Sequence, residues 1–333
     1  MKALVYTDTA ELTYRDAPMP EVPEGYDLIR IEASGICGSD MHAFLGHDER
    51  RPTPLVLGHE AAGTVVGGDN DGRRVTINPL NACGTCEVCQ QGRENLCAER
   101  KIISMPPREG AFAEYVAIPR ENLVTVPDHV SFAQASLCEP LACGWHGVRL
   151  ADECLGKPMG DARCLVIGGG AIGVGGALSL AAFGAKDITI LEPNPMRQKT
   201  LEALGIAQVA GAEGAPDPGQ MDVVIDAVGY SATRATACAQ ARPGGVIVHI
   251  GLGEAEGGLD VRRLTLQEIR LICTYTYTPQ DFRETAAAIF DGRLGALDWT
   301  EERPLEQGQS AFDDIRAGRV ASPKIILIPA HKE

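Results

Sequence analysis

Four cysteines lie close together in the chain and could bind a metal ion. They follow the spacing C-x2-C-x2-C-x7-C, at Cys83, Cys86, Cys89 and Cys97. Four thiolates complete the tetrahedral coordination of Zn²⁺ and leave no position for water, so such a site would be structural. An iron–sulfur cluster uses similarly short cysteine spacings and is the alternative. A zinc ribbon that binds nucleic acid would have two separated cysteine pairs in basic surroundings, whereas this run includes Glu87 and Glu94.

A second set of possible ligands flanks this run in the sequence. The segments are GICGSDMH (Gly35–His42), LGHE (Leu57–Glu60) and CEPLA (Cys138–Ala142). Taken singly, Cys37 could be a small apolar residue, His59 a hydrogen-bonded loop histidine and Glu139 a surface acid. Their occurrence together with the four-cysteine run indicates a second metal site with different chemistry.

A glycine-rich turn in the second half of the chain is typical of nucleotide binding. Gly168, Gly170 and Gly173 form G-x-G-x-x-G between a strand-like run and a helix-like run. In that context the glycines let the backbone approach a pyrophosphate at the N-terminus of the helix. Ile172 is expected to offer a backbone N–H to this group. The chain has 38 glycines, so the motif gains its weight from its position between strand and helix.

An acidic residue at the end of the next strand predicts which dinucleotide is used. Glu192 lies 24 residues after Gly168. Its carboxylate suits the hydroxyls of the adenosine ribose and repels a 2′-phosphate, which predicts NAD over NADP. Arg197 could soften this preference, and a solvated turn acid is the alternative role for Glu192. A later segment is expected to contact the nicotinamide through its backbone, at Ile250, Gly251 and Leu252.

The elements expected to position these residues differ between the two halves of the chain. In the first half, apolar and polar residues alternate in MKALVYT and DLIRIEASGI, and further strands are expected at 72–80, 111–118 and LVTVPD. This half is predicted to be mostly β, antiparallel and partly open. The last 50 residues add an amphipathic helix, PQDFRETAAAIFDG, and a strand, KIILIPA, that could return to the first domain.

From about residue 146 the pattern changes to strands that alternate with helices. Strands are expected at ARCLVIG, DITILEP, 221–229, 244–252 and the end of 264–278. Helices are expected from the glycine turn to Phe183, at 195–204 and at 231–241. This alternation predicts an α/β fold with a doubly wound parallel sheet.

Length and charge exclude several classes of protein. The 333 residues suggest two domains, and the net charge of −15 argues against binding to nucleic acid or to an anionic membrane surface. Eleven cysteines without an export signal favour reduced thiols in the cytoplasm. The 22 uncharged residues between Arg163 and Lys186 could suggest a membrane span, but seven of them are glycine, and a strand, turn and helix explain them better.

With these motifs in this order, the chain resembles the zinc-dependent medium-chain dehydrogenases over essentially its whole length. The shared features are GICGSD-x-H, GHE, the four-cysteine run, the Glu-Pro pair and the glycine-rich turn. Glu139–Pro140 is similar to the polyol, threonine and butanediol dehydrogenase branch, because the ordinary alcohol dehydrogenases carry a second cysteine ligand there. The connection at 63–75 is shorter than in relatives and affects no ligand.

The resemblance implies a catalytic Zn²⁺ held by Cys37 and His59. Glu60 and Glu139 would compete with water for the remaining positions, which keeps the site open for substrate. Since Cys138 directly precedes Glu139, a register shifted by one residue is the alternative.

The resemblance also implies the residues that support this metal. Asp40 would orient His59 by a hydrogen bond. Ser39 would accept the proton of the substrate hydroxyl, and His42 would pass it outward, with the ribose of the cofactor between them.

The implied architecture is a GroES-like, mostly β catalytic domain at 1–147 and 278–333, with a Rossmann domain that binds NAD at 148–277. The implied reaction is hydride transfer from a secondary alcohol, such as a polyol, sugar-derived alcohol or diol, to NAD, with two zinc ions per chain. Alternatives are an alcohol or threonine dehydrogenase, a zinc-free quinone-reductase relative, and a zinc-binding protein without enzymatic activity. Relatives suggest a homodimer or homotetramer, and the substrate is expected to meet side chains such as Phe44, His47, Ile103 and Met105.

Overall fold

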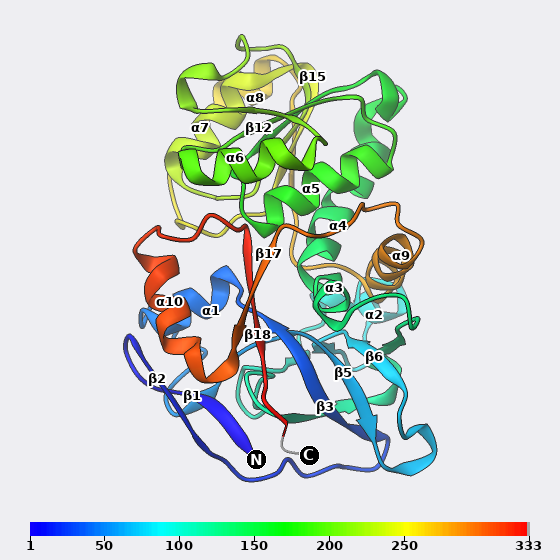
Figure 1. Cartoon of the computed structure of the whole chain (residues 1–333). Coiled ribbons are helices and arrows are strands. Elements are labelled where there is room, and N and C mark those ends of the chain that lie inside the picture. Colours follow the sequence, from blue (N-terminus) through cyan, green and yellow to red (C-terminus); the bar gives the residue numbers. More distant parts are fainter. Residues whose placement is uncertain (332–333) are drawn as a thin grey trace.

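Two sheets of different construction organise the chain. The computed structural model describes residues 1–331. Figure 1 shows a lower part built from the N-terminal and C-terminal segments and an upper part built from the middle of the chain. Both ends of the chain lie in the lower part, so the C-terminal segment returns to the first domain as predicted.

The lower part contains two larger sheets and one pair of short strands. The first sheet has the order β2-β1-β4, and the second has the order β10-β6-β5-β3-β18-β17, with β9 also paired to β3. All pairings in the second sheet are antiparallel except β17 with β18. The strands are β1 (Lys2–Asp8), β2 (Glu11–Asp16), β3 (Tyr26–Gly35), β4 (Leu55–Val56), β5 (Glu60–Val66), β6 (Arg74–Ile77), β7 (Leu80–Asn81), β8 (Lys101–Ile102), β9 (Tyr115–Pro119), β10 (Leu123–Thr125), β17 (Thr300–Pro304) and β18 (Lys324–Ile328).

The central strand of this part shows why its sequence forms a half-buried strand. In β3, buried and partly exposed residues alternate, because successive side chains point to opposite faces. Ile29 and Ile31 are fully buried in one core with Val75 and Ile77 of β6. The predicted antiparallel β structure is therefore confirmed in this part.

The upper part is a six-stranded parallel sheet with the order β13-β12-β11-β14-β15-β16. This order, read from the first strand, is that of a doubly wound dinucleotide-binding fold. The prediction of a doubly wound parallel sheet is confirmed, with one strand, β13, that the sequence pattern did not predict. The strands are β11 (Arg163–Ile167), β12 (Asp187–Leu191), β13 (Gln208–Ala210), β14 (Met221–Asp226), β15 (Ala241–His249) and β16 (Arg270–Cys273).

Helices connect the strands of the upper part and cover parts of the lower one. In the upper part they are α5 (Ala171–Ala182), α6 (Pro195–Leu204), α7 (Ser231–Gln240) and α8 (Val261–Leu266). In the rest of the chain they are α1 (Gly38–Phe44), α2 (Glu87–Gln90), α3 (Phe132–Ser136), α4 (Cys138–Leu155), α9 (Pro279–Phe290) and α10 (Gly308–Arg316). Within the described residues, no helix combines the length and apolar character needed to cross a membrane.

Helix α4 joins the two parts. It packs against α5 of the upper part and against α9 (Figure 1). A side chain on Gly144 would meet the backbone of Gly175 and Gly176 at 2.6 Å, so small residues allow the two helices to cross closely. The sequence pattern did not predict α4, and the expected domain boundary at 147/148 falls within it. Because α4 begins beside Glu139, it fixes that residue at the junction.

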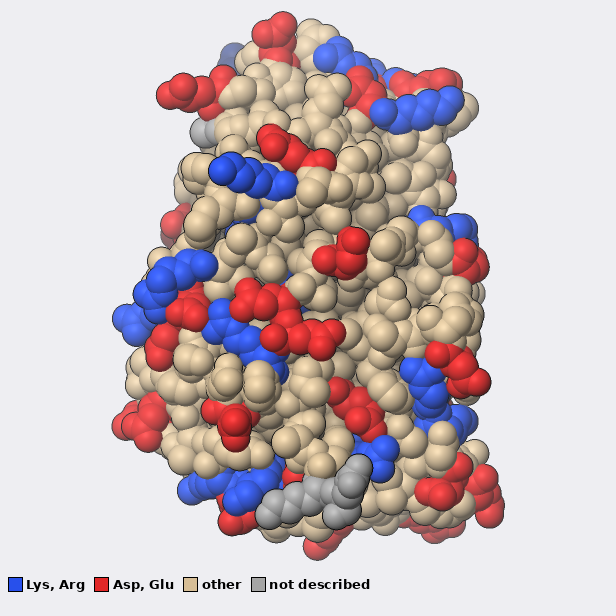
Figure 2. All heavy atoms as spheres, viewed as in Figure 1, with Lys and Arg blue, Asp and Glu red and all other residues tan. Residues whose placement is uncertain are grey.

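Charges are mixed on the molecular surface. In the view of Figure 2, acidic and basic side chains lie next to each other, and neither sign forms a broad continuous area. Many of these charges are paired, for example Arg319 with Asp314 at 2.6 Å. The net negative charge is therefore spread over the surface on this face.

Candidate active site and metal centres

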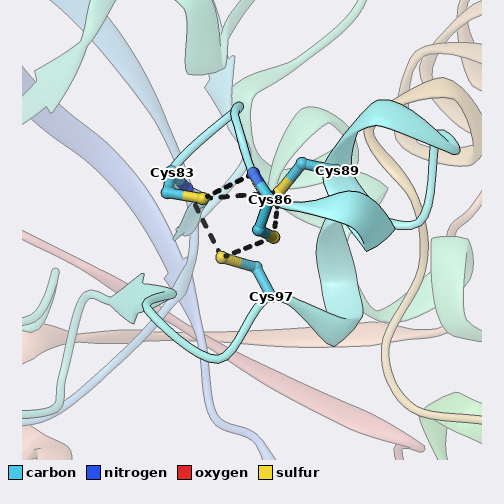
Figure 3. A group of neighbouring side chains, drawn as sticks. All are labelled: Cys83, Cys86, Cys89 and Cys97. Atoms are coloured by element: carbon cyan, nitrogen blue, oxygen red, sulfur yellow. Dashed lines mark hydrogen bonds between the residues drawn. The ribbon is translucent and has the colours of Figure 1, made fainter.

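The four-cysteine run forms a compact sulfur cluster (Figure 3). The Sγ atoms of Cys86 and Cys89 lie 3.4 Å apart, and those of Cys83 and Cys89 lie 3.9 Å apart. Zn–S bonds of about 2.3 Å give S···S edges of about 3.8 Å in a tetrahedron. A disulfide would need a sulfur–sulfur bond of about 2.05 Å. The four thiols therefore fit a tetrahedral zinc site, and all four ligand atoms lie within 4.8 Å of one another.

The environment of this cluster favours thiolates at its exposed edge. Backbone N–H groups of Thr85 and Cys86 lower the pKa of Cys83 to about 6. Burial raises the pKa of Cys89 to about 12, and hydrogen bonding with the other thiols adds to the rise. Thiolates this close together repel one another. A divalent cation would compensate their negative charge.

The second group of ligands is assembled where strands β3 and β5 pair. Gly35 at the end of β3 lies opposite Glu60 at the start of β5, so Cys37 and His59 come close together. Cys37, His59 and Glu60 each offer one ligand atom, and these three atoms lie within 4.8 Å of one another. A side chain at Gly35 would collide with the carboxylate of Glu60, so glycine leaves room for that acid.

Asp40 lies beside this group. It is fully buried and caps the first turn of α1, where its Oδ2 accepts the N–H of Cys37 at 3.0 Å. Its Oδ1 accepts the N–H of Gly58 at 3.3 Å and lies 3.4 Å from Nδ1 of His59. Because Nδ1 faces a carboxylate, Nε2 of His59 is the nitrogen left to bind a metal.

The charges of Asp40 and His59 support each other. Burial by itself would raise the pKa of Asp40, but the nearby His59 and Arg51 outweigh it and lower this pKa. Burial likewise opposes the charged form of His59, yet Asp40 and Cys37 together raise its pKa well above the usual value. The pocket therefore attracts positive charge, which suits a metal cation.

Glu60 has one oxygen fixed and one free. Lys324 of β18 donates from Nζ to Oε1 of Glu60 at 2.6 Å and to the carbonyl of Ile36 at 2.7 Å. The other oxygen, Oε2, is buried and has no hydrogen-bond partner among residues 1–331. A buried carboxylate oxygen without a partner is costly unless a ligand completes it. Glu60 therefore fits a metal ligand, with Lys324 setting its orientation.

Glu139 lies in the first turn of α4 but is not one of the three clustered ligands. Its Oε1 accepts a hydrogen bond from the buried hydroxyl of Tyr277 at 2.8 Å. Burial raises the pKa of Glu139 to about 7, with a further contribution from Glu60. Cys138, the residue of the alternative register, is fully buried and belongs to neither cysteine-containing cluster found within residues 1–331.

The two residues expected to move the proton lie on one face of α1. Ser39 Oγ is 3.5 Å from Nε2 of His59, so the hydroxyl borders the metal group. His42 follows three residues later in the same helix, and residues at this spacing share a helical face. A proton that passes from Ser39 to His42 would therefore move along this face of α1, away from His59.

The glycine-rich turn has the geometry that a dinucleotide requires. Gly168 follows β11 with φ of 100°, and Gly170 caps the N-terminus of α5. Gly173 packs so closely on the carbonyl of Gly168 that a side chain there would collide with it. The N–H groups of the first turn of α5, including that of Ile172, have no partner within the helix and face the turn.

Glu192 lies directly after β12 and is almost fully buried. Its two oxygens accept the N–H groups of Gly169 and Asn194, both at 2.8 Å. Arg197 Nη1 lies 3.6 Å from Oε2 of Glu192, so the predicted neighbour is indeed close. The acid is thus joined to the glycine-rich turn, at the carboxyl edge of the sheet.

The segment predicted to border the nicotinamide also lies at this edge. Ile250, Gly251 and Leu252 follow β15, and the N–H groups of the first two bond to the carbonyl of Asp226 at 3.0 Å. The structure thus places the ends of β11, β12 and β15 along one edge of the sheet. Two of the expected specificity side chains, Phe44 and Ile103, are instead fully buried in the hydrophobic cores. Their apolar character is explained by core packing.

The sequence analysis missed several residues of the site. Lys324 is a lone cation in the apolar run of β18, a pattern that can signal a buried ion pair. Tyr277 carried no comparable signal, because its partner Glu139 lies 138 positions away in the sequence, and nothing in the pattern around Arg51 marks it as part of the site. Arg51 is buried and donates to the carbonyls of Ser39 and Ser104.

Comparison with known protein families agrees with this arrangement. A family model described as "Alcohol dehydrogenase GroES-like domain" matches residues 23–128, and one described as "Zinc-binding dehydrogenase" matches residues 171–291. The first covers the β3–β10 region with three of the clustered ligands and the four cysteines. The second covers the helix after the glycine-rich turn and most of the parallel sheet.

Individual proteins are similar to the chain over most of its length. Sorbitol dehydrogenase of Bacillus subtilis is 28% identical, over 99% of this chain and 97% of that protein. L-Idonate 5-dehydrogenase of Vitis vinifera is 32% identical, over 76% of this chain and 74% of that protein. An Escherichia coli oxidoreductase of unknown specificity superposes with a TM-score of 0.90 at 25% identity, covering 99% of both chains.

Proposed function

From the membership of this chain in the zinc-dependent medium-chain dehydrogenase family, in its polyol-dehydrogenase branch, we propose that it oxidises a secondary alcohol of a polyol or sugar-derived alcohol to a ketone with NAD. The observation that carries this proposal is the group of Cys37, His59 and Glu60, of which the last two are buried, with Glu139 nearby. A thiolate, an imidazole and carboxylates, with a position left for substrate, make a catalytic zinc site.

The residues of this chain have separate tasks in the proposed reaction. A bound Zn²⁺ makes the substrate hydroxyl more acidic, and NAD accepts the hydride. Asp40 keeps the ring of His59 oriented, and Lys324 keeps Glu60 oriented. Ser39 receives the hydroxyl proton beside His59, and His42 passes it toward solvent.

Glu139 is proposed to act close to the metal, as a ligand or as a hydrogen-bonding partner of the substrate. Its hydrogen bond from Tyr277 leaves the second carboxylate oxygen available. Two carboxylates near one Zn²⁺ leave it more electrophilic than a second thiolate would. If Glu60 and Glu139 hold the metal, the site would suit a vicinal diol, which offers two oxygens.

NAD is proposed to bind with its pyrophosphate at Gly168, Gly170, Ile172 and Gly173. The ribose of its adenosine would lie by Glu192, and its nicotinamide by the segment 250–252. Glu192 supports this choice, because a buried carboxylate repels a 2′-phosphate. Arg197 is close enough to modulate the preference.

The remaining expectations concern the protein as a whole. We propose that the catalytic domain comprises 1–147 and 278–333 and the cofactor domain 148–277. We further propose a cytoplasmic homodimer or homotetramer that binds two zinc ions per chain.

A steady-state screen tests the proposed function. Zinc-loaded protein is mixed with NAD and with a vicinal diol, several polyols, threonine or ethanol, and NADH formation is followed by absorbance. The proposal expects a higher kcat/KM for diols and polyols than for ethanol. An equal kcat/KM for ethanol would assign the protein to the ordinary alcohol dehydrogenases, and activity with threonine alone would assign it to the threonine dehydrogenases.

A further inference from the structure

The loop between β15 and α8 has little packing to hold its shape. Residues 251–260 form neither helix nor strand, and none of residues 252–260 is buried. Four of the eight residues 251–258 are glycine, and the side chain of Leu252 is 73% exposed. We call residues 251–258 the β15–α8 loop. Because glycine is conformationally permissive and the loop buries almost no side chain, its conformation must be fixed by hydrogen bonds.

The side chain of Arg234, near the amino end of α7, supplies these hydrogen bonds. Its Nε donates to the carbonyl of Gly257 at 2.6 Å, and its Nη1 donates to the carbonyl of Glu254 at 2.9 Å. Its Nη2 donates to the carbonyl of Glu256. Nη1 also donates to the carbonyl of Gly229, just after β14, at 2.8 Å. One guanidinium therefore joins three carbonyls of the β15–α8 loop to the end of a neighbouring strand.

The surroundings of Arg234 differ from those of the buried Lys324, which pairs with Glu60. Arg234 is only 6% exposed, and its four acceptors are neutral backbone carbonyls, with no carboxylate paired to it in the described part of the chain. Burial of a charge without an ionic partner is costly, and a cation near the amino end of a helix opposes the helix dipole. Neither ion pairing nor helix stability therefore explains Arg234, whereas its planar set of N–H donors suits several carbonyls at once.

The β15–α8 loop that Arg234 holds borders the glycine-rich turn. Gly251 packs so closely on the backbone of Val228 that a side chain on Gly251 would collide with it. A side chain on Gly168 would collide with the side chain of Val228. The N–H of Gly253 donates to the carbonyl of Val228 at 3.1 Å. Val228 therefore lies between the glycine-rich turn and the loop, at the carboxyl edge of the sheet, where dinucleotides bind in folds of this type.

We propose that Arg234 is a positioning residue for the nicotinamide half of NAD. By holding the β15–α8 loop against the end of β14, it fixes the backbone of Gly251 and Leu252 before the cofactor binds. A loop that already has its bound conformation loses less freedom on binding, so the affinity for the cofactor is higher. This inference rests on the proposed function and adds to it a residue that acts through the loop.

Two ligands separate the nicotinamide from the rest of the cofactor. NADH and ADP-ribose share the adenosine, the pyrophosphate and the second ribose, but only NADH carries the nicotinamide. Binding of each ligand to the zinc-loaded protein is measured by calorimetry. Arg234→Met removes all four side-chain hydrogen bonds, so the Kd for NADH should rise about tenfold while the Kd for ADP-ribose changes less than about twofold.

Arg263 of α8 provides a matched control. Its side chain also donates to three backbone carbonyls, those of Cys238, Ala239 and Ala241. These carbonyls lie at the end of α7 and the start of β15, at the opposite end of that strand from residues 250–252. Arg263→Met should therefore leave the ratio of the two dissociation constants unchanged. An equal change of this ratio in Arg263→Met and Arg234→Met would overturn the inference.

A second variant keeps the charge at position 234. Arg234→Lys has a single nitrogen, which cannot reach all four carbonyls, so the ratio of the two dissociation constants should lie between those of the wild type and Arg234→Met. If Arg234→Met does not fold, Arg234→Lys decides, and a wild-type ratio in it contradicts the inference. A Kd that rises equally for NADH and ADP-ribose in Arg234→Met would show that Arg234 supports the whole cofactor domain, which also contradicts the inference.

The assay of polyol oxidation distinguishes this inference from the proposed function. If the wild type oxidises a polyol but the Arg234 variants keep its ratio of dissociation constants, the inference fails and the proposed function stands. If no polyol is oxidised but Arg234→Met weakens the binding of NADH alone, the inference stands and the polyol substrate is wrong. If the wild type binds neither NADH nor ADP-ribose, both fail.

Discussion

The two candidate metal centres are built in opposite ways. The four-cysteine cluster takes all its ligands from residues 83–97, and Cys83 is exposed. The group of Cys37, His59 and Glu60 depends on the pairing of β3 with β5 and on a lysine of β18, and its His59 and Glu60 are buried while Cys37 is partly exposed. A local site can form around its metal, whereas the assembled site requires the whole lower sheet. The first should therefore serve stability and the second chemistry.

The largest expected effect is the loss of turnover in Cys37→Ala. Removal of this thiolate leaves the catalytic site without one of its ligands, so kcat should fall by about 10³-fold or more. The zinc content should decrease from two ions to one per chain, while NADH binding, measured by fluorescence, should hardly change because the glycine-rich turn is untouched. Cys273→Ser, an exposed cysteine outside both clusters, should keep two zinc ions. Loss of NADH binding together with turnover would show that Cys37 has a structural role.

Cys97→Ser should have the opposite profile. Since zinc binding by a local cluster is coupled to folding of that segment, loss of this thiolate should lower thermal stability strongly. Elemental analysis should find one zinc ion, and a chelator should destabilise the wild type more than the variant. Iron and sulfide in the wild type would replace the zinc interpretation with a redox cluster. An unchanged melting temperature would contradict the structural role.

The comparison also explains how much the sequence could predict. The spacing of Cys83 to Cys97 and of the glycine-rich turn fixes local geometry, so the proximity of the four cysteines and the turn before α5 could be predicted from neighbouring residues. The pairing of Lys324 with Glu60 joins residues 264 positions apart and depends on the strand order β5-β3-β18. A periodicity in one segment carries no information on such a partner.

The helices show the same difference between local and distant information. α6 was expected at 195–204 and is observed at Pro195–Leu204, because its capping Asn194 and the proline after it mark its start locally. α4 was missed, although it runs from Cys138 to Leu155. Its glycines and its polar histidine weaken the local helical pattern, and packing against α5 and α9 stabilises it instead.

The next largest effect is expected for the ion pair that supports the assembled site. Lys324→Met leaves the carboxylate of Glu60 buried without its partner, so unfolding in denaturant should become easier by about 3–5 kcal/mol. Lys324→Arg keeps the charge and should recover most of the loss. The double variant Lys324→Met/Glu60→Leu removes both charges and should be more stable than Lys324→Met alone. Additive losses in the double variant would mean that the two side chains do not interact.

A smaller effect, dependent on pH, is expected where α4 meets α9. Asp281 is buried and accepts hydrogen bonds from Arg149 and Thr278 and pairs with His146 at 2.7 Å. Burial opposes the charged carboxylate, but these partners outweigh it and lower the pKa of Asp281. A carboxyl whose pKa is lower in the folded protein stabilises it above the unfolded pKa of about 4, and this contribution is lost as the pH falls further.

Asp281→Asn tests this contact by denaturant unfolding at several pH values. At pH 6 to 7 the variant should be less stable than the wild type by about 2–3 kcal/mol, because it loses hydrogen bonds to a charged group. The difference should shrink below pH 4, because the carboxyl of Asp281 then becomes protonated in the unfolded wild type while it stays charged in the folded one. Comparing the two proteins at each pH cancels the release of zinc, which affects both. A difference that stays constant down to pH 3 would show that the carboxylate charge contributes nothing.

The smallest effect is expected for the choice between NAD and NADP, because this choice depends on Glu192, which contacts the glycine-rich turn from the next strand. Glu192 closes the glycine-rich turn through the N–H of Gly169, so replacing it by alanine would disturb both the turn and the charge. Glu192→Gln removes the charge and keeps one acceptor oxygen for the N–H of Gly169, although its amide group replaces the oxygen that accepts from Asn194. It should reduce the preference for NAD over NADP by about tenfold in kcat/KM, because a 2′-phosphate is no longer repelled. Arg197, 3.6 Å from Glu192, would then be free to attract that phosphate, so Glu192→Gln/Arg197→Met should show a smaller shift than Glu192→Gln alone. A wild type that uses NADP as well as NAD would show that the buried acid only closes the turn.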